Sequence, residues 1–263
     1  MLDKLKPISG IHSINRVVAT IFSPQKFLKP QDVYNKVIPL KGFNKYAKKS
    51  LIKPRNFILS MNSVEIKEED IEGFVFEGYD KSGAIKDVFK LQNTSNSMSV
   101  VSFETRKYTR WENFKNSFKS DLYTMSSEVD FYVNAISLNY RDEFNWSDKN
   151  TDIKVESIFM KDEESQLLNK KFLSSKNGTI IMISKGTENE NNYEDKIEIS
   201  FNNDVKKIVI DHQYAIRLSE LKLFKNIFSN EEFINLFDIA HDENKRALKD
   251  ILTKECQELI GLS

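Results

Sequence analysis

The amino-acid sequence predicts an α+β fold in which two antiparallel β-meander halves are each followed by an amphipathic helix, with a long helix at the C-terminus. Short segments of strand character, separated by polar turns, occur in the first half of the chain and again after residue 177. Each group of strands is followed by apolar residues at helical spacing. Short polar connections favour antiparallel pairing, so we expect sheets with helices packed on one face.

The first half is predicted to span residues 1–150. Its opening strand candidate, RVVATIFSP (16–24), ends at a proline, which cannot donate to a strand ladder. After a basic stretch, four segments have strand character: 56–66, 73–80, 84–91 and 97–104. The middle two flank the turn-forming residues Asp80-Lys81-Ser82-Gly83, which indicates a hairpin.

The periodicity then changes to that of a helix. Thr109 and Glu112 have the spacing of a capping box, which predicts a helix beginning near residue 110. Its apolar stripe consists of Trp111, Phe114, Phe118, Leu122 and Met125. A strand over 132–144 is expected to follow it.

The second half is predicted to span residues 151–263 and to form one compact unit with the first. Three strands are expected over 178–186, 196–202 and 206–216, with an exposed hairpin loop at 188–195. Ser229 and Glu232 form a second capping box, which opens a predicted long helix from about 230 to 260.

Composition restricts the classes of function. Lys and Arg number 39, and so do Asp and Glu, so the overall charge gives no strong attraction to nucleic acid or to an anionic membrane. The one cysteine, Cys256, allows no intrachain disulfide and favours a reducing compartment. The N-terminal residues show no signal-peptide pattern, and no segment has the apolar length of a membrane span. We therefore expect a cytoplasmic protein that makes no membrane contact.

The motifs of common enzyme classes are absent from the sequence. It contains neither a P-loop nor a G-x-G-x-x-G loop, and no G-x-S-x-G elbow. Cys256 lies on the predicted apolar side of the last helix, so we expect an inert packed thiol. The sequence therefore predicts no catalytic residue, no metal ligand set and no cofactor.

Two alternatives to a non-enzymatic protein-binding role stay open: a metal-dependent hydrolase or nuclease, and a nucleic-acid-binding protein. Asp238 and His241 share a helix face and, with Asp211 and His212, could converge in a metal-dependent hydrolase or nuclease. Adjacent strand residues point to opposite faces, however, which separates Asp211 from His212. The basic stretch 41–55 contains aromatic residues, a composition that single-stranded nucleic-acid binders use.

Four blocks of sequence carry a resemblance to a known family. They are SFETRKYTRWENF (102–114), LNYRDEF (138–144), VIDHQYAI (209–216) and AHDENKRALKDILTKECQELIG (240–261). In this order they resemble a sporadically distributed family of bacterial proteins of similar length, which has no established activity. Scattered occurrence implies mobile genes of the kind found in anti-phage defence or toxin–antitoxin loci.

These observations predict a non-enzymatic cytoplasmic binding or regulatory module. We expect a protein partner encoded nearby, and the stretch 41–55 is the candidate for a nucleic-acid contact. The residues predicted to lie at the interface belong to the strand-to-helix joint and to the strand that follows the helix: Arg106, Tyr108, Arg110, Trp111, Tyr140, Arg141 and Asp142.

Overall fold

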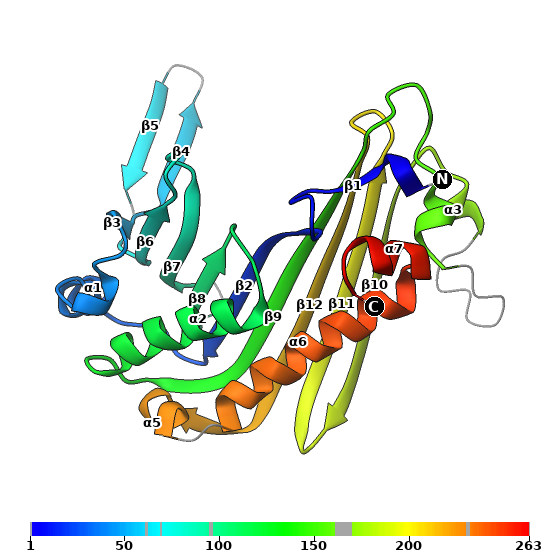
Figure 1. The fold of residues 1–263 in the computed structure, drawn as a ribbon. Helices are drawn as coiled ribbons and strands as arrows, with labels where there is room; N and C mark the ends of the chain where they lie inside the picture. Colours follow the sequence, from blue (N-terminus) through cyan, green and yellow to red (C-terminus); the bar gives the residue numbers. More distant parts are fainter. Residues whose placement is uncertain are drawn as a thin grey trace. The chain divides into compact units, whose positions relative to one another are not determined.

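The computed structural model describes residues 2–60, 63–68, 70–94, 97–160, 170–229 and 232–262 (Figure 1). Its strands are β1 (Leu5–Pro7), β2 (Ile14–Ser23), β3 (Lys48–Ile52), β4 (Arg55–Ser60), β5 (Ser63–Glu68), β6 (Gly73–Tyr79), β7 (Ile85–Asn93), β8 (Ser99–Thr105), β9 (Tyr132–Trp146), β10 (Asn177–Glu188), β11 (Asn191–Asn202) and β12 (Lys207–Leu223). Its helices are α1 (Pro30–Val37), α2 (Trp111–Ser126), α3 (Val155–Ile158), α4 (Lys170–Leu173), α5 (Phe224–Ser229), α6 (Glu232–Ile251) and α7 (Lys254–Leu259), with short 3-10 turns η1 (Leu2–Lys4) and η2 (Lys41–Phe43).

The predicted fold class is wrong. The two runs of strands do not form separate meanders. Strands β2 and β9 pair between them and join β3, β6, β7 and β8 to β10, β11 and β12 in one antiparallel sheet of ten. The strand order is β10-β11-β12-β9-β2-β8-β7-β6-β3, with β1 pairing to β9 outside this path. Alternation along a strand predicts which residues face a core, but it does not specify the distant strand with which that strand pairs.

The long C-terminal helix is also wrong. Helix α6 ends at Ile251, and α7 begins after Thr253, whose backbone is extended (φ −60°, ψ 153°). The Thr253 hydroxyl accepts a hydrogen bond from the Cys256 amide and so caps α7. Apolar residues recur at helical spacing on both sides of this break, which is why the periodicity alone indicated one helix.

The predicted capping box of the first long helix is not formed. Arg110 is the residue preceding α2 and makes no side-chain cap, while the Thr109 hydroxyl instead accepts a hydrogen bond from the Asn113 amide group (2.9 Å). The second predicted box includes Ser229 and Glu232, and part of it lies outside the described residues. Among the described residues, no helix has both the length and the apolar composition needed to cross a membrane.

The chain divides into two compact units, and each is discontinuous in sequence. Unit 1 contains residues 1–17, 137–216 and 236–263, and unit 2 contains 18–136 and 217–235. The predicted halves, 1–150 and 151–263, are consecutive stretches, and that division stays a prediction.

The core of unit 1 lies between its strands and the helices α6 and α7 (Figure 1). Leu248 and Ile251 of α6 are buried in one cluster with Ile208 and Ile210 of β12. Cys256 of α7 belongs to the same cluster, and burial raises the pKa of its thiol to about 12. The predicted burial of Cys256 is therefore confirmed.

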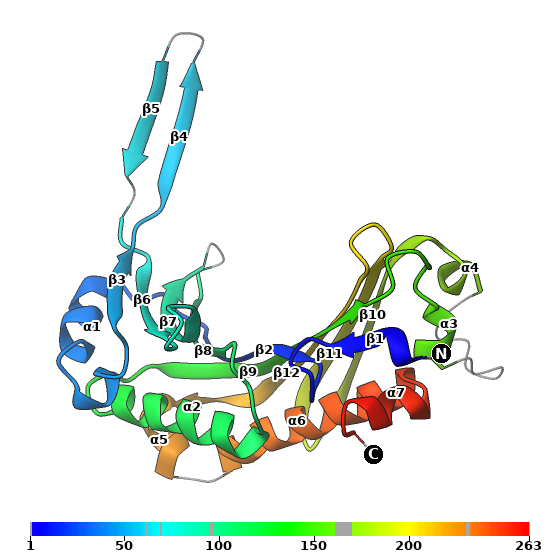
Figure 2. The same cartoon turned by 45° about the horizontal axis from the view of Figure 1, so that its top comes forward.

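The core of unit 2 is rich in aromatic rings. Phe103 of β8 packs against Phe114 and Phe118 of α2, with ring centroids 5.4 and 6.3 Å apart. Phe43 of η2 contacts Phe76 of β6 edge-to-face at 5.2 Å. Strands β4 and β5 pair only with each other, as a two-stranded ribbon that continues from β3 and β6 (Figure 2).

Candidate functional site

Strand β10 is the edge strand of the sheet in unit 1. It pairs with β11 over twelve consecutive residue pairs, from Asn177 opposite Asn202 to Glu188 opposite Asn191, without a register shift. In the part of the chain that the structure describes, no other strand pairs with its second side. Because the amides and carbonyls of a strand point alternately to its two sides, half of those on β10 face away from the sheet.

The side chains of β10 divide between two faces. Ile180 and Met182 pack partly buried against the core of unit 1. Ile181 and Ile183 lie on the opposite face, where their side chains are 52% and 56% exposed. β-Branched residues favour the extended backbone, which explains the strand, but burial within unit 1 does not explain these two isoleucines.

The edge lacks most features that protect an exposed strand from pairing. Natural edges are short, charged, bulged or interrupted by proline. Strand β10 is long, has no bulge against β11, and contains only one charged residue, Lys185, between Gly178 and Thr187. It is therefore a surface suited to the addition of another strand.

The β10–β11 turn is tighter than the loop that the sequence predicts over 188–195. Only Asn189 and Glu190 lie outside the strands, with φ values of 48° and 68°. Positive φ at both central residues is the geometry of a type I′ hairpin turn, which follows the twist of the flanking strands. The left-handed backbone at Glu190 is costly for a residue with a side chain, so the long pairing of β10 with β11 must support it.

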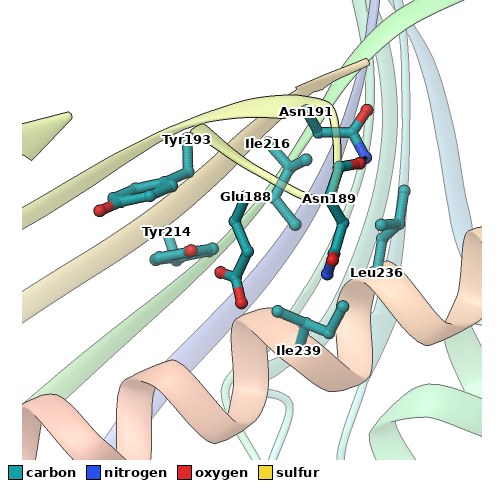
Figure 3. A pocket seen from close by; sticks show the side chains of 8 residues that line it. All are labelled: Glu188, Asn189, Asn191, Tyr193, Tyr214, Ile216, Leu236 and Ile239. Carbon is teal, nitrogen blue, oxygen red and sulfur yellow. Dashed lines mark hydrogen bonds between the residues drawn. The ribbon is translucent and has the colours of Figure 1, made fainter. Parts of the chain in front are cut away.

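A hollow beside this turn is too small for an ordinary ligand. The rings of Tyr193 and Tyr214 stack at 5.5 Å and 14°, and Glu188 lies beside them (Figure 3). The space measures about 280 Å³ including open solvent, below the range of small-molecule sites. Burial raises the pKa of Tyr214, so its hydroxyl supplies no group that titrates near neutral pH. The hollow is lined by Glu188, Asn189, Asn191, Tyr193, Tyr214, Ile216, Leu236 and Ile239.

Unit 2 has a wider surface groove of about 830 Å³. Tyr132, Leu221 and Phe233 give it an apolar lining, and Lys222 is the one charged residue among the described residues that line it. It holds no paired acid and base, so its chemistry does not suggest catalysis.

Unit 1 contains a buried carboxyl group that is only partly satisfied. Asp142 of β9 accepts a hydrogen bond from the Ser13 hydroxyl (2.6 Å) through Oδ1, while Oδ2 is buried without a hydrogen-bond partner. Burial raises the pKa of Asp142 to about 6, although the Ser13 hydrogen bond and the nearby His212 act in the opposite direction. The ionised form of this group therefore costs stability at neutral pH.

The two histidines of the predicted hydrolase are both buried and separately engaged. His212 Nε2 lies 2.7 Å from Asp195 Oδ1, and its Nδ1 lies 3.0 Å from Asn244 Nδ2. His241 Nδ1 shares a hydrogen bond of 2.7 Å with the Tyr140 hydroxyl. Side chains held in this way orient helix α6 on the sheet.

Asp211 does not join the histidines. Its carboxylate binds the Arg141 guanidinium (Nη1–Oδ2 2.8 Å), on the sheet face opposite to His212, as strand alternation requires. Among the described residues, no group of three or more His, Cys, Asp and Glu side chains is arranged to hold a metal ion. The described contacts therefore hold Asp211, His212 and His241 separately.

The seven predicted interface residues fall into two groups in different units. Arg106, Tyr108, Arg110 and Trp111 lie in unit 2. Arg106 Nε binds Glu104 at 2.6 Å, and Trp111 stacks on Phe114 at 5.7 Å. These contacts fit a strand-to-helix corner, and a binding role for the group stays a prediction.

The other three residues, Tyr140, Arg141 and Asp142, follow one another on β9 in unit 1. Tyr140 and Asp142 are buried, and Tyr140 contacts His241 of α6, whereas Arg141 lies on the other face of the strand. Arg141 binds Glu143 (2.7 Å) as well as Asp211, and Lys207 binds the second oxygen of Glu143 (2.6 Å). Their role in binding also stays a prediction.

The basic stretch 41–55 is partly neutralised within unit 2. Lys45 pairs with buried Asp121 at 2.7 Å, and Lys48 pairs with Glu77 at 2.7 Å. The ammonium group of Lys49 donates to the Ile38 carbonyl at 3.1 Å. Contact with nucleic acid through this stretch stays a prediction.

The sequence interpretation includes β10 as a strand but not as a site. The available signal is the uncharged run Thr179 to Ser184, which includes three isoleucines. The missing information is the strand order, in which no second described strand pairs with β10. Comparison with known proteins finds no matching family model and no matching curated protein, so the bacterial family resemblance stays an expectation.

Proposed function

We propose that this protein is a non-enzymatic binding module that holds a protein partner by adding a strand of that partner to β10. The observation that carries the proposal is the free edge itself, a ladder of twelve residues with two half-exposed isoleucines. In strand addition, main-chain hydrogen bonds supply affinity and alternate side chains supply specificity.

The magnitudes support a specific complex. A hydrogen bond between backbone groups contributes about 0.5–1.5 kcal/mol net, and full burial of an isoleucine contributes about 1.5–3 kcal/mol. Ile181 and Ile183 are already half buried, so each would add about half of that amount. Several edge hydrogen bonds and two isoleucines can therefore offset the entropy lost on association.

The resemblance to a mobile bacterial family is the reason to place such a module in an anti-phage defence or toxin–antitoxin system. A regulatory subunit of such a system needs a partner surface and no catalytic centre. The separately held side chains of Asp211, His212 and His241 give less support to a hydrolase than the open strand gives to a binding module.

The test is a comparison of edge and control variants in affinity purification from the native host. Ile181→Lys combined with Ile183→Lys places charges on the free edge, whereas Val205→Lys changes another exposed apolar residue of unit 1. We expect the tagged wild type and the tagged control each to recover a partner protein in a molar amount comparable with their own. That partner can be an untagged copy of the chain itself. The edge variant should recover at least about tenfold less. Equal recovery with the edge variant, or no recovered protein with the wild type, would contradict the proposal.

A further inference from the structure

We infer that the strand added to β10 is β10 of a second copy of the chain, paired antiparallel about a two-fold axis at Met182. The inference rests on the proposed function, because it names the partner of the same edge. A two-fold axis makes such a contact isologous, so one surface serves both copies.

Strand geometry restricts the register. Outward-facing and inward-facing backbone groups alternate along β10, and hydrogen bonds form only where outward-facing residues of the two copies are opposite one another. With identical strands, this condition is met when the two-fold axis passes at a residue, and fails when it passes midway between two residues. The axis can then lie at Ile181, Met182 or Ile183 near the middle of the strand.

The side chains select Met182 among these three. An axis at Met182 places Ile181 of each copy opposite Ile183 of the other, which brings four half-exposed isoleucines together. An axis at Ile183 would place Ile181 opposite Lys185. An axis at Ile181 would place Ile183 opposite Thr179.

Charge complementarity supports the same register. Lys176 lies immediately before β10 and Glu188 is its last residue, so an axis at Met182 places them opposite one another twice. The ammonium group of Lys176 lies 3.4 Å from Asp204, and both of these side chains are mostly exposed. An exposed pair of this kind is weak, so Lys176 can turn to Glu188 of the second copy.

The core face is also compatible with the pairing. Met182 packs partly buried against the core of unit 1, and in the inferred register it meets Met182 of the second copy. The apolar layer of one copy would then continue into the other. Gly178 would lie opposite Gly186, so no bulky side chains oppose each other at these positions.

Engineered cysteines test the register directly. Opposite residues of an antiparallel pair have Cα atoms about 4.5–5.5 Å apart, within the range of a disulfide. Met182→Cys should therefore form a disulfide-linked dimer by itself under mild oxidation. Ser184→Cys is the matched control, since the two copies of residue 184 would lie about 13 Å apart, and this residue is exposed. A mixture of Ile180→Cys and Ser184→Cys should form the mixed disulfide.

Charge reversal provides a second measurement on the full chain. Lys176→Glu and Glu188→Lys should each weaken dimerisation about tenfold, because each change affects two pairs. The double reversal should restore the affinity to within about threefold of the wild type. Light scattering over a concentration series measures these dimer affinities.

The outcomes separate this inference from the proposed function. A dimer that cross-links through Met182→Cys and dissociates on charging Ile181 and Ile183 supports both. A wild type that stays monomeric at its highest soluble concentration, yet captures another protein through β10, would overturn the inference and leave the function standing. A monomer without β10-dependent capture would overturn both, and a dimer unaffected by the edge changes would overturn the inference.

Discussion

The strands that begin and end the strand order differ in length and protection. Strand β3, in unit 2, has five residues, and its Lys48 pairs with Glu77 at 2.7 Å. The Lys49 carbonyl accepts a hydrogen bond from the Tyr34 hydroxyl of α1 at 3.3 Å. Strand β10, in unit 1, has twelve residues and two exposed isoleucines. The same chain protects one edge and leaves the other open, which is expected if the open edge has a partner.

Two buried aspartates show a similar contrast. Asp121 in unit 2 accepts a hydrogen bond from Tyr46 and pairs with Lys45. Asp142 in unit 1 has Ser13 for one oxygen, and its second oxygen is unsatisfied. Burial raises the pKa of both carboxyl groups, but Lys45 and Tyr46 act against this rise at Asp121, whereas Asp142 has only the Ser13 hydrogen bond and the nearby His212.

The largest expected effect comes from removing the difference between the two edges. Ile181→Lys with Ile183→Lys gives β10 the charge that β3 already has, and each lysine would oppose a lysine of the second copy. We expect self-association to weaken by at least about 100-fold in sedimentation equilibrium. Thermal stability should be unchanged at concentrations where both proteins are monomeric, because both positions are half exposed. The comparison would fail if Val205→Lys weakened association equally.

Asp142→Asn should show how much the ionised, incompletely hydrogen-bonded Asp142 carboxylate lowers the free energy of unfolding. The folded-state pKa of about 6 exceeds the ordinary value of 3.8, so the folded protein binds a proton more tightly between these pH values. Wild-type stability should therefore fall as pH rises from about 4 to 6, by up to about 3 kcal/mol from this group.

The asparagine variant lacks this titration. Urea unfolding should show its stability rising relative to wild type between pH 4.5 and pH 7. Parallel pH dependence of the two proteins would show that Asp142 is not the source.

Tyr46→Phe should destabilise unit 2 at the buried Asp121 carboxylate. It removes the hydroxyl that donates to Asp121 and leaves a buried carboxylate oxygen unpaired. A hydrogen bond to a charged group contributes about 1.5–3 kcal/mol, so we expect a loss of about 2 kcal/mol in urea unfolding. Tyr123→Phe, which changes an exposed tyrosine of α2, is the control and should have little effect. A similar loss in both variants would refute the role of this hydrogen bond.

The smallest expected effect is at the protected edge. Lys48→Val removes one charge from β3, but the strand stays short and the contact of Tyr34 with Lys49 remains. We expect no new oligomer in sedimentation velocity. Association of this variant through β3 would show that a single lysine, rather than the whole edge, provides the protection.

Local patterns predicted most of the elements but not their assembly. The alternation around Phe74 and Phe76 and the helical spacing from Phe114 to Met125 correspond to β6 and α2. The pairing of β9 with β2 depends on residues more than 100 positions apart, and no local pattern contains it. The break at Thr253 was missed because the apolar positions continue through it.

The candidate site was less predictable than the elements. Charged and aromatic residues such as Arg106 and Arg141 attract attention in a sequence, but in the structure both are engaged with neighbouring carboxylates. Ile181 and Ile183 look like core residues in the sequence. Only the strand order shows that, among the described strands, β10 pairs with β11 alone.

The most direct test of the central claim is amide hydrogen exchange of β10, measured by mass spectrometry on concentrated wild-type protein and on the Ile181→Lys, Ile183→Lys variant. An occupied edge protects the outward-facing amides, so peptides covering β10 should exchange slowly in the wild type and faster in the variant, with β3 unchanged. Equally fast exchange of the outward-facing amides in both proteins would contradict the claim that β10 is an interface.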